Sequence, residues 1–277
     1  MFTSLLYFDR CGENRFKAPP SPESSQPIFG GELLAQSLYA ALQSTDEERD
    51  VNSLHAYFLR PGDINVPVEF NVEYIRDGRS FSSRQVIAMQ QGKELFRTLV
   101  SIQTPAETPH YARGAMPDVP PPEYIPFTYD DFNSQQSGEN KRDGSRRPID
   151  IRYINPPSAR GESVTESQLM WMRIEGTLPD EPRIHRAGLA YLCDSTLIDH
   201  VMLPHGLHWQ DADFQGASLD HAMWFHRPAR ADQWLLFEQS VEATGGGRGL
   251  VSGRYFDRDG HLVANCIQEG LMRWATP

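Results

Sequence analysis

The sequence contains few cysteines, few positive charges and no long apolar run. Its 277 residues include three cysteines, Cys11, Cys193 and Cys266, whose spacing fits neither a metal site nor a redox pair. Because the number of cysteines is odd and they lie far apart in the sequence, we expect no disulfide framework and thiols without a redox role. No stretch approaches 18 consecutive apolar residues, which is the length of a membrane-spanning helix, so we expect no membrane contact.

Positive charge is scarce on this chain. Twenty-six Lys and Arg residues stand against 37 Asp and Glu residues, which gives a formal net charge of -11. Because no basic tract lies on a predicted helix face, we expect no nucleic-acid partner. An anionic small ligand would need a local cluster of Arg, Lys or backbone N–H groups. The basic run KRDGSRR (141–147) lies in a polar segment, where a solvated loop is favoured over a phosphate contact.

Targeting signals are also absent. The N-terminal MFTSLLYFDRCGENRF lacks a basic start, a sustained apolar run and a small-residue cleavage site. The C-terminal RWATP has no peroxisomal Ser-Lys-Leu ending. We therefore expect a cytoplasmic protein.

Apolar and aromatic residues are plentiful by contrast. Hydrophobic residues make up 39% of the chain, with 14 Phe, 10 Tyr and 5 Trp, so sizeable cores can form. The length suits two domains of about 100 to 130 residues each. HAYFLRPGD (55–63) is followed by the similar HAMWFHRPA (221–229), which indicates an internal repeat.

The repeat extends to the order of the elements. In each half an apolar segment at helical spacing precedes β-branched and aromatic runs that are separated by turn residues. The helices are expected over 29–45 and 183–199, and a Pro-rich polar connector over 106–160 separates the halves. We predict an α+β fold of two domains, 1–105 and 161–277, whose sheets pair edge to edge.

Short motifs suggest which residues of the two halves correspond. His55 matches His221, and the strand-ending Ile-Gln at 102–103 matches that at 267–268. The spacings between such motifs drift by a few residues, so the register inside the repeat stays open. For the two histidines a structural hydrogen bond is favoured over catalysis, which stays as the alternative.

Common catalytic signatures are missing. GASLD (216–220) has Asp where a serine-hydrolase elbow requires its second Gly, and no G-x-x-x-x-G-K-[ST] phosphate loop occurs. TGGGRG (244–249) lies between two predicted strands and is expected to be a hairpin turn. His200, His205 and His208 lack zinc-ligand spacing, so a loop role is favoured over a metal site.

Asp194 is the acid of greatest interest, because it falls on the predicted apolar helix of the second half. An ionised carboxylate that is buried there costs free energy unless it finds hydrogen-bond donors. The corresponding first-half helix offers Gln36 and Ser37 but no acid. Burial and neighbouring groups can move a pKa toward the working pH, so Asp194 is a candidate general base. A helix-end or solvent-facing acid is the alternative.

The chain resembles the acyl-CoA thioesterase II family in several motifs that occur in the family's order. They are FGGELLAQSLYAAL, HAYFLRPGD, RDGRSFSSRQVIAMQQGKELF, YLCDSTL, LDHAMWFHRP and IQEGLMR. The resemblance covers nearly the whole chain apart from the connector. It implies a double hot-dog fold, in which each half is a long helix wrapped by an antiparallel sheet.

The resemblance also implies an activity, the hydrolysis of fatty acyl-CoA to free fatty acid and CoA without a cofactor or metal. Carried over residue by residue, the catalytic trio that holds the attacking water falls on Asp194, Ser218 and Gln268. Ser218 departs from the family's usual Thr, although both hydroxyls supply one donor and two acceptors. The oxyanion donors are expected among backbone N–H groups at a helix start, either at Gly30-Gly31 or in the second helix.

Two rival functions stay open from the sequence. An enoyl-CoA hydratase on the same fold would add water to a double bond with an Asp/His pair. A non-hydrolytic acyl-CoA binding protein would hold the ligand without turnover, and the departure at Ser218 suggests this option. In each case acyl-CoA is the expected small-molecule partner, and the family resemblance implies a homo-oligomer, either a dimer or a tetramer.

Overall fold

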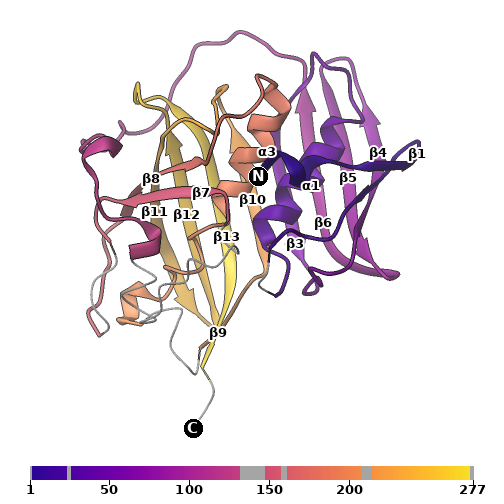
Figure 1. Ribbon diagram of the computed structural model, residues 1–277. Helices are drawn as coiled ribbons and strands as arrows, with labels where there is room; N and C mark the ends of the chain where they lie inside the picture. Colours follow the sequence, from indigo (N-terminus) through magenta and orange to yellow (C-terminus); the bar gives the residue numbers. More distant parts are fainter. Residues whose placement is uncertain (1, 24–25, 132–146, 157–160, 208–213, 275–277) are drawn as a thin grey trace.

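The computed structural model describes residues 2–23, 26–131, 147–156, 161–207 and 214–274 (Figure 1). Its helices are α1 (Gly30–Leu42) and α3 (Pro182–Cys193), with short 3-10 turns at Phe2–Leu6, Pro122–Tyr124 and Leu203–His205. The strands before the connector are β1 (Asp9–Gly12), β2 (Arg15–Ala18), β3 (Asp50–Phe58), β4 (Val68–Asp77), β5 (Phe81–Gln90) and β6 (Lys93–Gln103). The later strands are β7 (Ile149–Tyr153), β8 (Gln168–Ile174), β9 (Phe214–Ser218), β10 (Asp220–Phe225), β11 (Leu235–Gly245), β12 (Arg248–Phe256) and β13 (Leu262–Trp274).

All of these strands belong to one antiparallel sheet, whose order repeats about its centre. There β3 pairs with β10 and joins the two halves. Outward from the centre, the first half continues with β6, β5, β4, β2 and β1, and the second with β13, β12, β11, β8 and β7. The two lists correspond strand by strand, so the predicted duplication and edge-to-edge pairing are confirmed. This pairing removes one exposed edge from each half.

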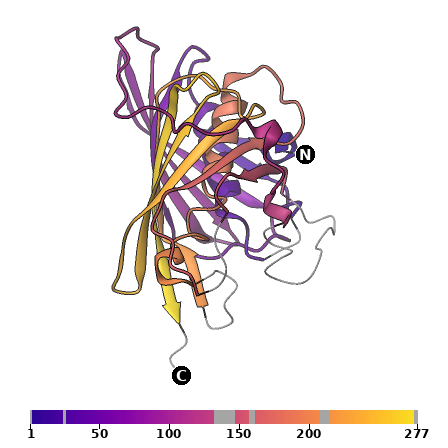
Figure 2. The ribbon, with the colours of Figure 1, turned by 90° about the vertical axis from the view of Figure 1, so that its left-hand side faces the viewer.

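Both helices lie on the same face of the sheet and pack against each other (Figure 2). Helix α1 is buried on nearly all sides, including Leu34 and Leu38, because α3 covers one side and the strands β3 to β6 cover the others. Helix α3 begins at Pro182. Proline has no backbone N–H group, and at the first position of a helix this group would have no acceptor within the helix, so no hydrogen bond is lost. No helix in the described ranges is both long and apolar enough to cross a membrane. The expected cytoplasmic location stays a prediction.

The strand pairing establishes which residues of the two halves correspond. Counted back from the shared Arg-Pro turns, His221 of β10 stands where Leu54 stands in β3. Leu54 pairs with Val100 of β6, and the matching partner of His221 in β13 is Gln268. All four side chains are buried on the helix-covered face.

This register differs from the expected one. His55 is exposed on the outer face, where its ring packs edge-on against Trp224 at 5.2 Å, whereas His221 is buried. The expected match of His55 with His221 is therefore wrong, and so is the match of Gln103 with Gln268. Side chains alternate between the two faces of a strand, so these odd shifts exchange the buried and the exposed face.

The segment expected to be a connector contains a strand. β7 pairs with β8 at one edge of the sheet, and its buried Ile149, Ile151 and Tyr153 alternate with the more accessible Asp150 and Arg152. Five residues of alternation are a weak signal inside a Pro-rich polar stretch, which explains why the strand was not predicted. The division of the chain into domains at 105 and 160 stays a prediction.

The glycine-rich stretch at 244–249 forms the predicted hairpin between β11 and β12. Gly246 and Gly247 have φ values of 59° and 75°, in the left-handed region that favours glycine. The three cysteines are free, with Cys11 exposed and the other two buried.

Candidate active site

Three segments that are distant in the sequence meet near the start of α1. Asp194 follows the last residue of α3, Ser218 ends β9, and Gln268 lies within β13. β9 pairs with β13 so that Ser218 stands opposite Gly270, which brings it next to Gln268. The structure thus brings together all three residues that the family resemblance singled out.

The three side chains form a closed triangle of hydrogen bonds. Gln268 Nε2 donates to Asp194 Oδ1 at 2.8 Å and to Ser218 Oγ at 2.7 Å. Ser218 Oγ donates to the same Asp194 Oδ1 at 3.3 Å. Within the described part of the chain, no hydrogen bond reaches Asp194 Oδ2. Oδ2 is therefore the carboxylate atom that is free to accept a proton.

The environment of Asp194 favours its protonated form more than water does. Burial raises the pKa of this carboxyl group from 3.8 to about 6. The hydrogen bond from Gln268, the positive charge of Arg147 and the hydrogen bond from Ser218 lower the pKa, and the nearby Asp199 raises it. A carboxylate with a pKa close to neutrality can both take up and release a proton at working pH.

The start of α1 faces the free oxygen of Asp194. A Cβ atom placed on Gly30 would lie 2.4 Å from Asp194 Oδ2 and 2.8 Å from the ring of Phe58, so the approach requires glycine. Phe29 at the N-cap makes no side-chain capping bond, and the first N–H groups of a helix have no intrahelical acceptor. The partial positive charge of the helix start therefore lies beside Asp194. Of the two expected places for oxyanion donors, this one adjoins the trio.

His221 contacts the trio through Gln268, which the sequence did not predict. Its Nδ1 lies 2.5 Å from Gln268 Oε1, and its Nε2 lies 3.0 Å from the sulfur of Cys193. The side chain is 1% exposed, and burial lowers its pKa to about 4, so the ring is neutral. The signal in the sequence is the Arg-Pro turn: His221 lies six residues before Arg227, as the apolar Leu54 lies six residues before Arg60, which indicates a buried position.

Arg147 is the second neighbour that was missed. Its guanidinium group stacks on the ring of Phe29 at 3.7 Å and donates to Glu23 Oε2 at 3.2 Å. Glu23 also accepts a hydrogen bond from the buried Tyr191 hydroxyl at 3.1 Å. Arg147 thus lies in a loop, as expected, but Phe29 and Glu23 hold its guanidinium group, so the expectation of a solvated side chain is wrong. The rest of the run at 141–146 lies outside the described residues.

The first half lacks this polar set. Ser218 corresponds to Val51, and His221 and Gln268 correspond to Leu54 and Val100, as the strand pairing shows. At the C-cap, where α3 is followed by Asp194, α1 is followed by Gln43. The acid, the hydroxyl, the amide and the histidine therefore occur together in the second half alone among these repeat-related positions.

A groove of about 1020 Å³ lies at the opposite end of the helix pair. Gln43 at the end of α1 lines it, together with Pro182 and Arg183 at the start of α3. No member of the trio lines this groove. The internal repeat relates this end of the helix pair to the end that carries the candidate site. Among the described residues, the groove lacks a hydrogen-bonded trio of acid, hydroxyl and amide like that of Asp194, Ser218 and Gln268.

Of the three histidines near residue 200, His200 and His205 have separate partners in the described residues. His200 is buried and interacts with Gln239 and with the Tyr153 hydroxyl, the latter at 3.3 Å. His205 Nε2 lies 2.8 Å from Thr244 Oγ1. His208 lies outside the described residues.

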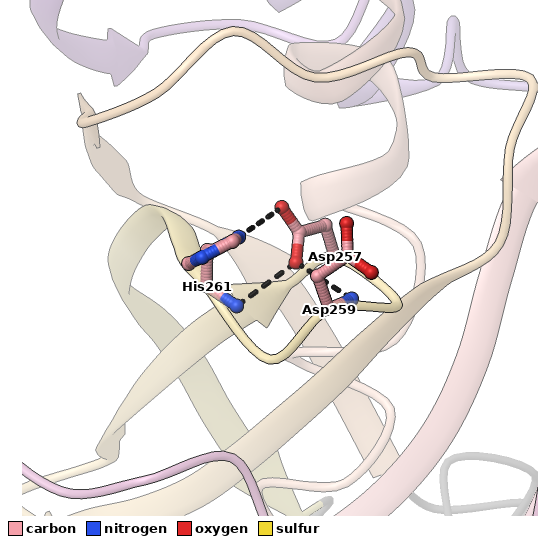
Figure 3. Close-up of side chains that lie close together, drawn as sticks. All are labelled: Asp257, Asp259 and His261. Carbon is pink, nitrogen blue, oxygen red and sulfur yellow. Dashed lines mark hydrogen bonds and ion pairs between the residues drawn. The ribbon is translucent and has the colours of Figure 1, made fainter.

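One group of side chains in the described residues has ligand atoms close enough together for a metal ion. Asp257, Asp259 and His261 lie in the exposed turn between β12 and β13, with one ligand atom each within 4.8 Å of the others (Figure 3). Asp257 already accepts hydrogen bonds from the backbone N–H groups of Asp259 and His261, and it contacts His261 Nδ1 at 3.1 Å. These hydrogen bonds stabilise the turn, and they explain why the three side chains lie close together.

Comparisons with known proteins cover both halves of the chain. The family model described as "Acyl-CoA thioesterase" matches residues 141–271, and the one described as "Acyl-CoA thioesterase N-terminal domain" matches residues 19–103. The mouse protein acyl-coenzyme A thioesterase 8 is 40% identical over 286 aligned residues, which cover 99% of this chain and 89% of the mouse protein.

Solved structures agree with these matches. The crystal structure of an acyl-CoA thioesterase II from Mycobacterium marinum has a TM-score of 0.80 at 36% identity, covering 99% of this chain and 98% of that one. A hot-dog protein of unknown function from Alicyclobacillus acidocaldarius has a TM-score of 0.79 at 21% identity, covering 99% and 98% of the two chains. The expected double hot-dog fold is therefore confirmed.

Proposed function

This chain belongs to the acyl-CoA thioesterase family, and from that membership we propose that it hydrolyses fatty acyl-CoA thioesters to free fatty acid and CoA. The observation that carries the proposal is the hydrogen-bonded trio of Asp194, Ser218 and Gln268 beside the start of α1. Thiolate is a good leaving group, so a positioned water and a base suffice for this chemistry.

We propose a separate task for each member of the trio, which its hydrogen bonds support. Gln268 uses its two N–H bonds on Asp194 and Ser218, so it orients both side chains. The water molecule can then donate one hydrogen to Asp194 Oδ2 and the other to the remaining lone pair of Ser218 Oγ. Its oxygen is left free to face the thioester carbonyl carbon.

Hydrolysis then proceeds in two steps. The water oxygen bonds to the carbonyl carbon while Asp194 takes the proton, and the carbonyl electron pair moves onto oxygen. N–H groups at the start of α1, around Gly30-Gly31, donate hydrogen bonds to this oxyanion. When the carbonyl re-forms, the C–S bond breaks, and the sulfur of CoA leaves with the electron pair and receives the proton from Asp194.

The test compares the wild type with Asp194→Asn, which keeps the size of the side chain and removes the base. Medium- and long-chain acyl-CoAs are supplied, and free thiol is followed with a chromogenic reagent. We expect the wild type to release thiol and the variant to lose a factor of about 10² to 10⁴ in kcat. Full activity of the variant would refute Asp194 as the base, and absence of thiol release by the wild type would refute the proposed function.

The same preparation tests the two rival functions. Hydration of crotonyl-CoA, followed by ultraviolet absorbance, would identify a hydratase. Tight acyl-CoA binding without thiol release would identify a binding protein. No contact in the described residues favours either of these over hydrolysis.

We also propose that the protein is a homo-oligomer, a dimer or tetramer formed by further copies of this chain. The support is an apolar patch on the outer face of the central strands, made by Tyr57, Leu99 and Trp224. These side chains are 62%, 49% and 37% exposed. Because β3 pairs with both β6 and β10, the three lie on neighbouring strands, and His55 packs against Trp224 between them. Exposed apolar patches of this kind are typical of protein interfaces.

A further inference from the structure

His221 lies at the centre of the sheet on a strand that supplies no member of the trio. Its two ring nitrogens both have partners, Gln268 Oε1 at 2.5 Å and Cys193 Sγ at 3.0 Å. No other side chain in the described residues hydrogen-bonds to Gln268 Oε1, so His221 alone holds the oxygen end of that amide, while Asp194 and Ser218 hold the nitrogen end.

The chemistry of the neighbours determines the tautomer of His221. An amide oxygen can only accept a hydrogen bond, so Nδ1 carries the ring proton and donates it to Gln268. In the neutral ring Nε2 is then bare and lies 3.0 Å from the sulfur of Cys193. Burial raises the pKa of this thiol, so it keeps its single proton, which the backbone oxygen of Ala190 also accepts at 3.1 Å. The hydrogen bonds therefore run in one direction, from His221 through Gln268 to Asp194.

The direction matters because the two ends of a glutamine amide have nearly the same shape. If the Gln268 amide turned over, its oxygen would face Asp194 Oδ1, and two acceptors would be in contact. Both hydrogen bonds from Nε2, to Asp194 and to Ser218, would be lost at once. The donor at the Nδ1 position of His221 adds to this preference, because it gives the oxygen end of the amide its own hydrogen bond.

The internal repeat indicates that the fold itself does not need this histidine. At the corresponding place the first half has Leu54 opposite Val100, both buried and without polar groups. Leucine therefore fits this strand position, and the histidine is retained where its neighbour is Gln268.

We propose that His221 is a positioning residue for the thioester hydrolysis proposed above, and that it acts by holding the Gln268 amide with its nitrogen toward Asp194 and Ser218. His221 does not touch the reacting atoms. Its removal should therefore slow the chemical step while leaving substrate binding nearly unchanged.

The experiment compares three substitutions of His221 in the full chain. His221→Leu copies the first half, His221→Asn keeps an N–H donor near the Nδ1 position, and His221→Gln can place a donor only near the Nε2 position. We expect kcat to fall about 10- to 100-fold for His221→Leu and His221→Gln at nearly unchanged KM, and to stay within about threefold of wild type for His221→Asn. In a Gln268→Val background, His221→Leu should have no further effect, because the amide it orients is gone.

Two kinetic outcomes would overturn the proposal: a His221→Leu variant with wild-type kcat, or a His221→Asn variant no more active than His221→Gln. The double variant with Gln268→Val recreates the Leu-Val pair of the first half, and its melting temperature checks that the sheet tolerates the change. A proton NMR signal of the His221 Nδ1–H should be present at low field in the wild type and in Asp194→Asn, and absent in Gln268→Val. This signal does not require turnover, so an inactive wild type that shows it would refute the proposed function alone, and its absence would refute the contact.

Discussion

At the level of single residues, the pKa of Asp194 decides at which pH the proposed reaction runs. Burial raises this pKa to about 6, so below pH 6 the carboxyl group holds a proton and cannot accept one from water. We expect kcat/KM to rise about tenfold per pH unit up to pH 6 and to level off above it. Initial rates between pH 4.5 and 8.5 measure the inflection. An inflection near the ordinary aspartate value of 3.8 would contradict this assignment.

Arg147 should shift that inflection. Its positive charge lowers the pKa of Asp194, so Arg147→Gln should move the inflection to higher pH. Arg173→Gln is a matched control, because Arg173 also bonds a carboxylate, Asp150, and stacks on an aromatic ring, Trp234. Its inflection should equal that of the wild type. Equal shifts in the two variants would mean that the effect is not the charge of Arg147.

Ser218 provides a further prediction at this scale. Ser218→Thr keeps the hydroxyl group and adds a methyl that restricts its rotamer, so we expect kcat to stay within about threefold of wild type. Ser218→Ala removes the hydrogen bond to Asp194 and a contact to the attacking water, and kcat should fall about 10- to 100-fold. Steady-state kinetics of both variants give the result, and an Ala variant as active as the Thr variant would refute the role of the hydroxyl.

At the level of elements, the contact between the start of α1 and the end of α3 positions the reacting groups. In Gly30→Ala the new methyl would lie 2.4 Å from Asp194 Oδ2, so the carboxylate or the helix start has to move. A displacement of about 1 Å can cost about 10²-fold in rate, and we expect a loss of that order in kcat.

Gly245→Ala is the control for this substitution, because a Cβ atom there would meet nothing within 4 Å and the backbone needs no positive φ. It should leave kcat unchanged. Thermal melts of both variants separate a local effect from loss of the fold, and a Gly30→Ala variant with normal kcat and a normal melting temperature would refute the close contact.

The elements also show how far the sequence alone could lead. Helical spacing of apolar residues predicted both helices, and the alternating runs predicted most strands, because these patterns depend on neighbours in the chain. The register between the halves could not be predicted from matching letters: His55 and His221 look alike and lie on opposite faces. The trio was named through the family resemblance, while His221 and Arg147 were missed because their contacts are with residues distant in the chain.

At the level of the whole molecule, duplication supplied the architecture and divergence supplied the candidate site. The two halves have the same strand order and pair with each other through their central antiparallel strands. A repeated unit of one helix and several strands predicts this pairing, because it covers an exposed strand edge in each half. One end of the helix pair carries the acid, the hydroxyl and the amide, whereas the repeat-related end has Val51, Val100 and Gln43 at the matching places. The duplicated fold thus carries the candidate site at one of its two repeat-related ends.

The outer face of the same central strands leads to a prediction about assembly. If further copies of the chain cover the patch of Tyr57, Leu99 and Trp224, the protein in solution should have two or four times the chain mass of 31.4 kDa. Leu99→Glu places a charge inside that interface and should shift the mass toward that of one chain, because a buried unpaired charge is costly. Tyr111→Glu is the control, since Tyr111 is 91% exposed and lies outside the sheet. Light scattering after size-exclusion chromatography gives the masses, and a wild-type mass of one chain at high concentration would refute the oligomer, because the patch would then be solvent-exposed in the native protein.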